Sequence, residues 1–138
     1  MTEYCAGFMF EGNKVALVRK NRPSWQKHKL NGIGGHVEPG ENPINAMARE
    51  FQEETCYHTY ACEWVHFCTL SGKDWMVHFY YKFGDTSLLQ TTTDEEVVVI
   101  PISEVTSENS IPDLTWLIPM AKSMVAERAK HFSIKENY

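Results

Sequence analysis

The 138-residue sequence lacks any apolar run long enough to span a bilayer, and it lacks the pattern of a signal peptide. Cysteine is sparse, with residues only at positions 5, 56, 62 and 68 and no C-x-x-C pair. These absences argue against a membrane protein and against a disulfide-stapled domain. We therefore expect reduced thiols in a cytoplasmic protein.

Positive charge is also scarce, because 13 Lys and Arg face 18 Asp and Glu, for a formal net charge of −5. This balance predicts no broad basic surface and argues against general binding of nucleic acid or membranes. The chain shows no internal repeat, low-complexity segment or interdomain linker. We expect residues 1–138 to form a single domain.

An acidic segment that follows a glycine-rich turn is the most informative feature. The turn, residues 34–41, reads GGHVEPGE, and residues 49–54 read REFQEE. Between them, Asn42 suits a helix N-cap and Pro43 suits the first helical position. The pattern therefore predicts a helix that begins at Pro43 and carries the acidic residues.

Three carboxylates share one face of that helix, because Glu50, Glu53 and Glu54 stand at i, i+3 and i+4. Like charges at this spacing destabilise a helix by about 0.2–0.5 kcal/mol per pair. The helix gains nothing from the crowding unless a cation binds there. Hard oxygen ligands of this kind suit Mg²⁺ or Mn²⁺, so we expect a divalent-metal site.

A solvated acidic face, with Arg49 simply pairing with Glu53, is the alternative interpretation. It explains the charges, but it does not explain the fixed distance from Gly35 to Glu41. It also does not explain the apolar stripe on the opposite side of the helix, which comprises Ile44, Met47, Ala48 and Phe51. We therefore prefer the metal site.

Residues 35–57 resemble the Nudix box, G-x5-E-x7-R-E-U-x-E-E-x-G-U, in which U is a bulky apolar residue. The matching positions are Gly35, Glu41, Arg49, Glu50, Phe51, Glu53, Glu54 and Tyr57. One position departs from the pattern, because Cys56 stands where the family has glycine, in the loop after the helix.

The resemblance implies an α/β fold, an α/β/α sandwich with a mixed β-sheet between helices. It also implies a pyrophosphatase activity, the metal-dependent hydrolysis of a diphosphate bond in a nucleoside diphosphate linked to a group X. The substrate would be a nucleoside triphosphate, a modified nucleotide, an ADP-sugar or a dinucleotide. An RNA 5′ end stays open without being favoured, as does a homodimer. The alternative function is a non-catalytic nucleotide-sensing or protein-interaction module on the same fold.

The resemblance also implies roles for individual residues. The catalytic set would be Glu50, Glu53 and Arg49, and the metal ligands would be Glu50, Glu53, Glu54 and Gly35, the last through its carbonyl. Arg49 would orient a glutamate through a charge-assisted hydrogen bond, and Glu41 would support the junction of loop and helix or join the metal shell through water. Glu50 would serve as a ligand or as the general base.

A later acidic cluster offers other candidates for the base or for an extra ligand. Asp94, Glu95 and Glu96 lie just before an expected strand. Glu95 and Glu96 alternate across the start of that strand, so at most one should face the site. A solvated charge cluster is an equally open interpretation of these residues.

Substrate binding is predicted in the loop that precedes the glycine-rich turn. Trp25 could stack on a base while Arg22 and Lys29, with other cations of the loop, contact phosphates. The alternative is a solvated loop whose tryptophan packs onto the core.

Periodicity predicts the remaining elements. Strands are expected at residues 1–10, 15–19, 61–70, 75–83 and 96–102, with a short extended piece at 35–37 and loops at 21–32 and 84–94. A final helix is expected after Asp113, with an apolar stripe of Leu117, Met120, Ala121, Met124 and Val125 and with Pro119 in its first turns.

Overall fold

The computed structural model describes residues 1–127 and 132–136, apart from the side chains of residues 125–127 and 132. The strands are β1 (Thr2–Glu11), β2 (Lys14–Arg19), β3 (Leu30–Asn31), β4 (Ile33–His36), β5 (Val65–Ser71), β6 (Trp75–Phe83), β7 (Val97–Pro101) and β8 (Phe132–Lys135). The α-helices are α1 (Pro43–Thr55) and α2 (Leu114–Glu127), and short 3₁₀ turns lie at Ser24–Gln26, Ala61–Glu63, Thr86–Leu88 and Ile102–Glu104.

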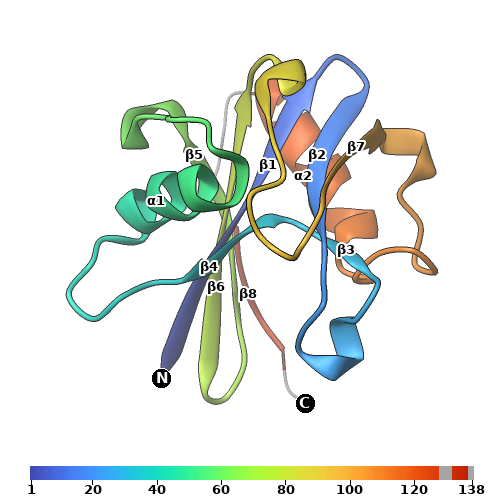
Figure 1. Ribbon diagram of the computed structural model, residues 1–138. Helices are drawn as coiled ribbons and strands as arrows, with labels where there is room; N and C mark the ends of the chain where they lie inside the picture. The colour runs from blue at the N-terminus through green and yellow to red at the C-terminus, as the bar shows by residue number, and fades with distance from the viewer. Residues whose placement is uncertain (128–131, 137–138) are drawn as a thin grey trace.

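The strands form a mixed sheet in the order β3-β2-β1-β6-β5-β8, with β4 paired to β1 and β7 paired to β2. The β1–β6 and β5–β8 pairs are parallel, and the others are antiparallel. Helices α1 and α2 cover opposite faces of this sheet (Figure 1). The expected α/β/α sandwich with a mixed sheet is confirmed.

The sheet separates two cores, as the side-chain alternation of its strands requires. On β1, Cys5 and Met9 pack on the α1 side, whereas Phe8 and Phe10 pack on the α2 side. The α2 core also contains Leu117, Ala121 and Met124 from the predicted stripe, and Met120 is partly buried against it. The side chain of Val125 lies outside the described residues.

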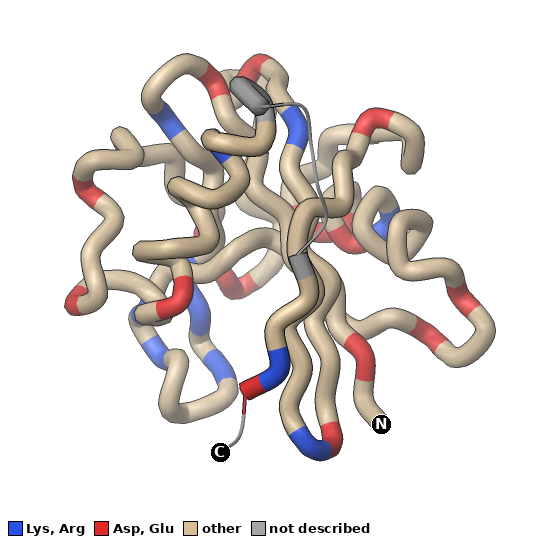
Figure 2. The backbone as a smooth tube through the Cα atoms, turned by 180° about the vertical axis from the view of Figure 1, so that it is seen from behind, with Lys and Arg blue, Asp and Glu red and all other residues tan. Residues whose placement is uncertain are grey.

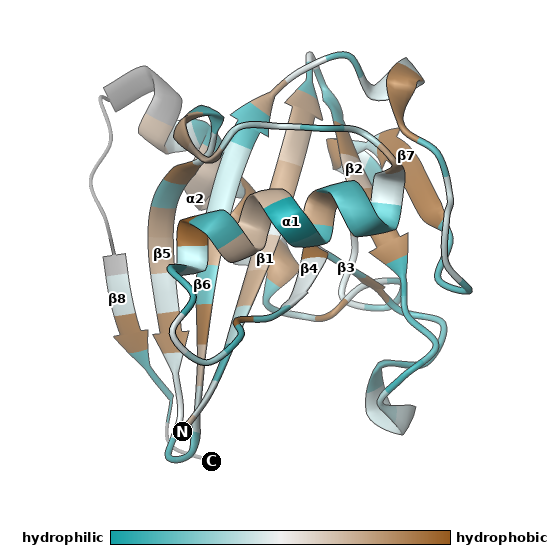
Figure 3. Ribbon diagram, turned by 60° about the vertical axis from the view of Figure 1, so that its left-hand side comes forward, coloured by the Kyte–Doolittle hydropathy of each residue, from teal (hydrophilic) through white to brown (hydrophobic). Residues whose placement is uncertain are grey.

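Helix α1 begins and buries itself as its sequence predicts. The Asn42 side chain accepts a hydrogen bond from the Ile44 amide at 3.1 Å, and Pro43 is the first helical residue. Met47 and Phe51 are fully buried, and Phe51 packs edge-on against Trp64 with ring centroids 5.0 Å apart. In Figure 3, α1 crosses the sheet with hydrophilic residues on its outward side. The apolar stripe therefore fixes which face of α1 carries the carboxylates.

Several predicted elements differ from the structure. Residues 61–64, predicted as strand, lie outside β5: Ala61–Glu63 form a 3₁₀ turn, in which the Glu63 carboxylate accepts from the Tyr60 amide at 2.6 Å, and Trp64 is extended. The predicted loop at 21–32 contains β3, which pairs with β2 because Leu30 is buried. Strand β4 begins earlier than the predicted piece, and β7 is shorter by a residue at each end.

Strand β8 was not predicted from the sequence, and it extends the sheet beyond β5. Pro119 lies inside α2, as expected. The Asp113 side chain accepts from the Trp116 indole instead of capping the backbone, while its carbonyl accepts from the Leu117 amide at 2.9 Å. None of the helices formed by the described residues is long and apolar enough to cross a membrane.

Candidate active site

Two glycines of β4 allow close approach to their neighbours. A Cβ on Gly34 would lie 1.9 Å from the Cys5 carbonyl oxygen on β1, so only glycine fits the pairing there. A Cβ on Gly35 would lie 2.6 Å from the carboxyl carbon of Glu50. The Glu50 carboxylate therefore packs directly against the Gly35 backbone, which brings the turn and the acidic helix face together.

Arg49 connects this turn to the helix through four groups. Its Nε and Nη2 donate to the two oxygens of Glu41, both at 2.9 Å, in a bidentate pair. Its Nη1 donates to Glu50 at 3.0 Å and to Glu53 at 3.3 Å. Its Nη2 also donates to the His36 carbonyl at 3.0 Å. One guanidinium thus orients three carboxylates, which its rigid planar fork suits it to do.

Glu41 closes the loop before α1. Its Oε1 accepts the Glu38 amide at 3.0 Å in addition to the Arg49 bond. The hydrogen bond from Arg49 holds the pKa of the Glu41 carboxyl below its ordinary value. Glu41 therefore acts as an ionised brace between the turn and the helix.

Glu50 and Glu54 lie in a different electrostatic environment from Glu41. Burial raises the pKa of both carboxyls, although Arg49 opposes this effect at Glu50 and the Thr93 hydroxyl opposes it at Glu54. Glu53 is more open, with its side chain 57% exposed. The raised pKa values mark two carboxylates that nearby cations compensate incompletely.

The described residues, 1–127 and 132–136, contain no preformed group of three His, Cys, Asp or Glu side chains that could hold a metal ion. Arg49 engages Glu50 and Glu53, while Glu54 bonds to Thr93 at 3.1 Å. The helix brings all three carboxylates to one face, but their side chains do not converge. The described residues therefore place these carboxylates on one face of α1 without a preformed coordination shell.

The three residues of the acidic cluster at 94–96 lie in different surroundings. Glu95 is buried, with its side chain 7% exposed, and accepts from Lys20 at 3.0 Å and from the Asn21 amide at 2.6 Å. Burial raises its pKa, but these hydrogen bonds prevail and hold the pKa below its ordinary value. Glu96 is exposed and lies 3.5 Å from Arg19. Asp94 pairs with Arg22 at the surface.

The loop between β2 and β3 carries the predicted substrate-binding residues. Figure 2 shows basic positions recurring along it. Trp25 is 66% exposed, so the alternative in which it packs onto the core is wrong. Arg22 lies close enough to Glu54 for the two charges to interact, whereas the Lys29 amine donates to the Glu108 carbonyl. The structure thus brings Arg22, but not the Lys29 amine, toward the helix carboxylates.

A family model of the NUDIX domain matches residues 4–121. The chain belongs to the NUDIX family. A curated relative named as a methanol dehydrogenase activator, from Bacillus methanolicus, is 28% identical over 129 residues, covering 86% of this chain and 70% of the relative.

Solved structures share the fold of this NUDIX chain. A MutT protein from Bacillus halodurans superposes with a TM-score of 0.73 at 14% identity, covering 100% of this chain and 90% of its own. A NUDIX hydrolase from Nitrosomonas europaea superposes with a TM-score of 0.68 at 16% identity, covering 99% and 79%.

Cys56 is the position at which this chain departs from the NUDIX pattern. It terminates α1 with φ 60° and ψ 18°, in the left-handed region, and its amide donates to the Gln52 carbonyl at 2.8 Å. Glycine occupies that conformation without steric penalty, which accounts for the family's residue at this position. The chain therefore keeps the expected backbone geometry with a cysteine in it.

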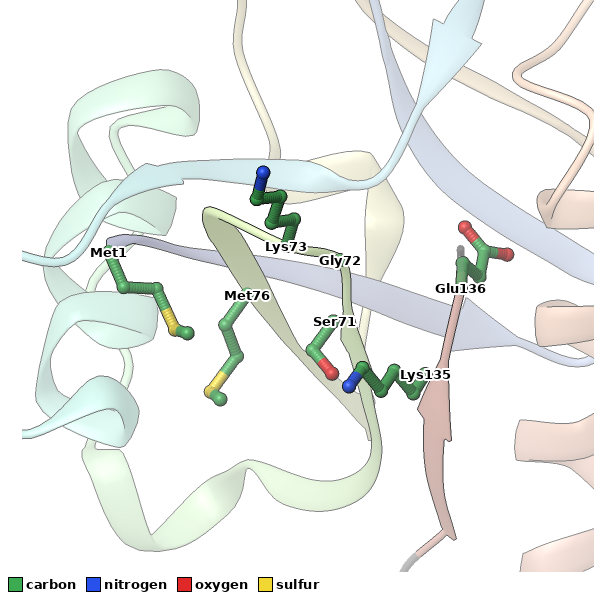
Figure 4. Close-up of a pocket in the computed structure, with 7 residues that line it drawn as sticks. All are labelled: Met1, Ser71, Gly72, Lys73, Met76, Lys135 and Glu136. Carbon is green, nitrogen blue, oxygen red and sulfur yellow. The ribbon is translucent and has the colours of Figure 1, made fainter. Parts of the chain in front are cut away.

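Two open cavities of about 470 Å³ each lie away from the carboxylate face of α1. One lies beside the β5–β6 turn, where Figure 4 shows Met1 and Met76 on one side and Lys135 and Glu136 on the other. The other lies between the start of β1 and the loop at 37–41, and it touches Glu41 from outside. Neither cavity is lined by Glu50, Glu53 or Glu54. We therefore locate the site from the arrangement of these carboxylates on α1.

Thr93 is the site neighbour that the sequence did not indicate. Its hydroxyl lies 3.1 Å from Glu54 Oε2 and 3.1 Å from the Glu95 amide. Lys20 was expected among the loop cations that contact phosphates, but its amine donates to Glu95, and Asn21, whose amide also donates to Glu95, was not singled out. These contacts join segments far apart in the chain, and no local pattern reports them.

Proposed function

We propose that this NUDIX protein hydrolyses a diphosphate bond in a nucleoside diphosphate linked to another group, with Mg²⁺ or Mn²⁺ as cofactor. The observation that supports this most directly is the Arg49 network, which orients Glu41, Glu50 and Glu53 against a turn that has no side chain at Gly35. A solvated acidic face needs no such organisation. A site that receives a cation and a phosphate does.

The donor chemistry of the site fits a hard divalent cation. Glu50, Glu53 and Glu54 would hold it, with the Gly35 carbonyl as a further oxygen ligand. Two of these carboxylates are partly buried and have raised pKa values, so a nearby cation would relieve the cost of ionising them. When bound, such an ion lowers the pKa of water and neutralises charge on phosphoryl oxygens.

The protein's own residues would supply orientation. Arg49 would hold the carboxylates of Glu50 and Glu53 in place, through bonds of 3.0 and 3.3 Å. Trp25, exposed on its loop, would stack on a base, while Arg22 would exchange its surface pair with Asp94 for a phosphate. Such an exchange costs little, because exposed ion pairs contribute only about 0–1 kcal/mol.

The contacts of Glu95 and Glu96 help to decide which residue is the general base. Both oxygens of Glu95 already accept hydrogen bonds, and its lowered pKa makes it a poor proton acceptor near neutral pH. Glu96 is directed toward Arg19. These contacts favour the helix glutamates, with Glu50 first because burial raises its pKa.

A second candidate function follows from the relative named as a methanol dehydrogenase activator. On that reading, the chain would act on another enzyme through the same diphosphate chemistry or through binding alone. The non-catalytic alternative predicts nucleotide or protein binding without turnover. We rank this non-catalytic function second, because Glu50, Glu53 and Glu54 are all retained.

A turnover screen with a matched control tests the proposal. The protein with Mg²⁺ or Mn²⁺ would be incubated with nucleoside triphosphates, oxidised nucleotides, ADP-sugars, NAD-like dinucleotides, dinucleoside polyphosphates and capped RNA, and products would be identified by mass spectrometry. Glu54→Gln should lower turnover by several orders of magnitude, whereas Glu104→Gln, at an exposed carboxylate on another segment, should not. Nucleotide binding without cleavage of any substrate would instead support the sensing module.

A further inference from the structure

Glu54 is oriented differently from the other carboxylates on α1. Arg49 donates to the carboxylates of Glu41, Glu50 and Glu53, and it also donates to the His36 carbonyl. Glu54 instead interacts with Thr93, and it lies close enough to the carboxylates of Glu95 and Glu50 for their charges to repel it. Its direction therefore depends on groups outside the glycine-rich turn.

Thr93 has the hydrogen bonds needed to fix that direction. The Glu95 amide donates to Thr93 Oγ1 at 3.1 Å, which leaves the hydroxyl hydrogen to be donated. Two acceptors are within reach, Glu54 Oε2 at 3.1 Å and the Glu95 carbonyl at 3.4 Å. The carboxylate is both nearer and the stronger acceptor, so the hydroxyl should donate to Glu54.

The segment that carries Thr93 is itself attached at both ends. The Gln90 amide donates to the Thr55 carbonyl at 3.0 Å, and the Thr92 hydroxyl donates to the Glu53 carbonyl, so the segment follows the end of α1. On the other side, Glu95 accepts from Lys20 and from the Asn21 amide, at the start of the loop between β2 and β3, here called the substrate loop. Thr93 thus lies between the acidic helix and the loop that carries Trp25.

From this geometry we propose that Thr93 is a positioning residue for Glu54: its hydroxyl occupies Oε2 and so leaves Oε1 available as a ligand for the cation. The proposal rests on the function proposed above, because it assigns Thr93 to the support of a metal ligand. It adds a second support that is independent of Arg49 and lies outside the NUDIX box. Loss of a hydrogen bond to a ligand in this way typically weakens metal affinity on the order of 10–100-fold.

The first experiment measures Mn²⁺ affinity by electron paramagnetic resonance in substrate-free protein. Thr93→Val removes the hydroxyl with little change of shape and should weaken binding on the order of 10–100-fold. Thr93→Ser keeps the hydroxyl and should restore the affinity. Thr91→Val is the matched control. The Thr91 hydroxyl accepts from the Val97 amide at 3.0 Å, and among the described residues it makes no hydrogen bond to α1.

The second experiment needs no metal. Urea unfolding midpoints of metal-free wild type, Thr93→Val, Glu54→Ala and the double variant form a cycle, and the two substitutions should be non-additive if the hydroxyl bonds to Glu54. Additive shifts would overturn the contact. Wild-type affinity for Mn²⁺ in Thr93→Val would overturn the positioning role even if the contact exists. Wild-type protein that binds no Mn²⁺ would instead overturn the metal site itself, which is a failure of the proposed function and is recognised separately.

Discussion

The turn before α1 and the segment after it attach to the same helix by different chemistry. The turn attaches through Arg49, whose guanidinium bonds to Glu41, Glu50 and the His36 carbonyl. The later segment attaches through the hydroxyls of Thr92 and Thr93. The first attachment is made by a charged side chain and lies mostly within the box, whereas the second is made by hydroxyl groups from a segment far away in the sequence. The same acidic helix is therefore held on one side by an ionic network and on the other by hydroxyl donors.

Arg49→Lys would break the first attachment and should have the largest effect. Lysine keeps the charge but cannot form the bidentate pair with Glu41 while also reaching Glu50. We expect a loss of about 2–3 kcal/mol in the free energy of unfolding, because partly buried carboxylates lose their partner. Activity should fall about 100-fold. Denaturant unfolding and steady-state kinetics measure the two effects.

Arg19→Lys is the control for that substitution. Arg19 pairs with Glu96 at 3.5 Å on an exposed surface and donates to the His28 carbonyl at 3.4 Å. Its replacement should change the unfolding free energy by less than about 1 kcal/mol. Equal effects of the two substitutions would contradict the special role of Arg49.

Gly35→Ala tests the close approach of turn and helix. The added Cβ would lie 2.6 Å from the Glu50 carboxyl carbon, so the Glu50 side chain must move. We expect a destabilisation of about 1–3 kcal/mol and a fall of about tenfold in kcat/KM. Gly40→Ala is the comparison, because a Cβ there meets no atom within 4 Å and adds only left-handed strain at φ +79°. It should lower stability without lowering kcat/KM.

Glu95→Gln tests whether Glu95 anchors the substrate loop or acts as the general base. If Glu95 anchors the substrate loop, the substitution should lower the unfolding free energy by about 1–3 kcal/mol at neutral pH. Its pKa is held below the ordinary 4.5, so its stabilisation is present above pH 4.5 and is lost as the pH falls through the lowered pKa. The difference from wild type should therefore vanish in acid.

The neighbouring variant Glu96→Gln supplies the reference for that experiment. Its side chain is 64% exposed, so its removal should change stability by less than about 0.5 kcal/mol. A Glu95→Gln protein with unchanged stability and a large fall in kcat would instead identify Glu95 as the base.

Cys56→Gly should have a small effect, and in the opposite direction. Cys56 has a φ of 60°, a conformation that is unfavourable by about 1–2 kcal/mol for residues other than glycine. Glycine removes that strain, so thermal unfolding should occur at a higher temperature while turnover is unchanged. A lower melting temperature would show that the cysteine side chain contributes packing at the helix end.

The sequence predicts the acidic helix well because its signals are local. Asn42 and Pro43 mark its start, and the spacing of Met47 and Phe51 shows which face is buried. Once that face is known, the direction of the glutamates follows. The sandwich with a mixed sheet was implied by the resemblance and is confirmed by the structural neighbours.

Other features depend on contacts that no local pattern encodes. Thr93 lies 39 positions after Glu54, and a run of three threonines reads only as a polar loop. Strand β8 is short and pairs at the edge of the sheet with β5. The misassigned strand at 61–64 follows from a side-chain bond of Glu63 to its own turn, which competes with sheet pairing.

The parallel pairing of β1 with β6 has a consequence for how the chain acquires its structure. Residues 2–10 align with residues 75–83 along their whole length. During synthesis from the amino terminus, most of the α1-side core emerges before β6, because among its described buried residues Tyr80 alone comes after residue 74. The α2-side core still lacks Phe79, Tyr81 and α2 itself at that point. Truncated chains that end before residue 75 should therefore expose the face of β1 that packs against α2 and should aggregate, whereas chains that include α2 should resist proteolysis.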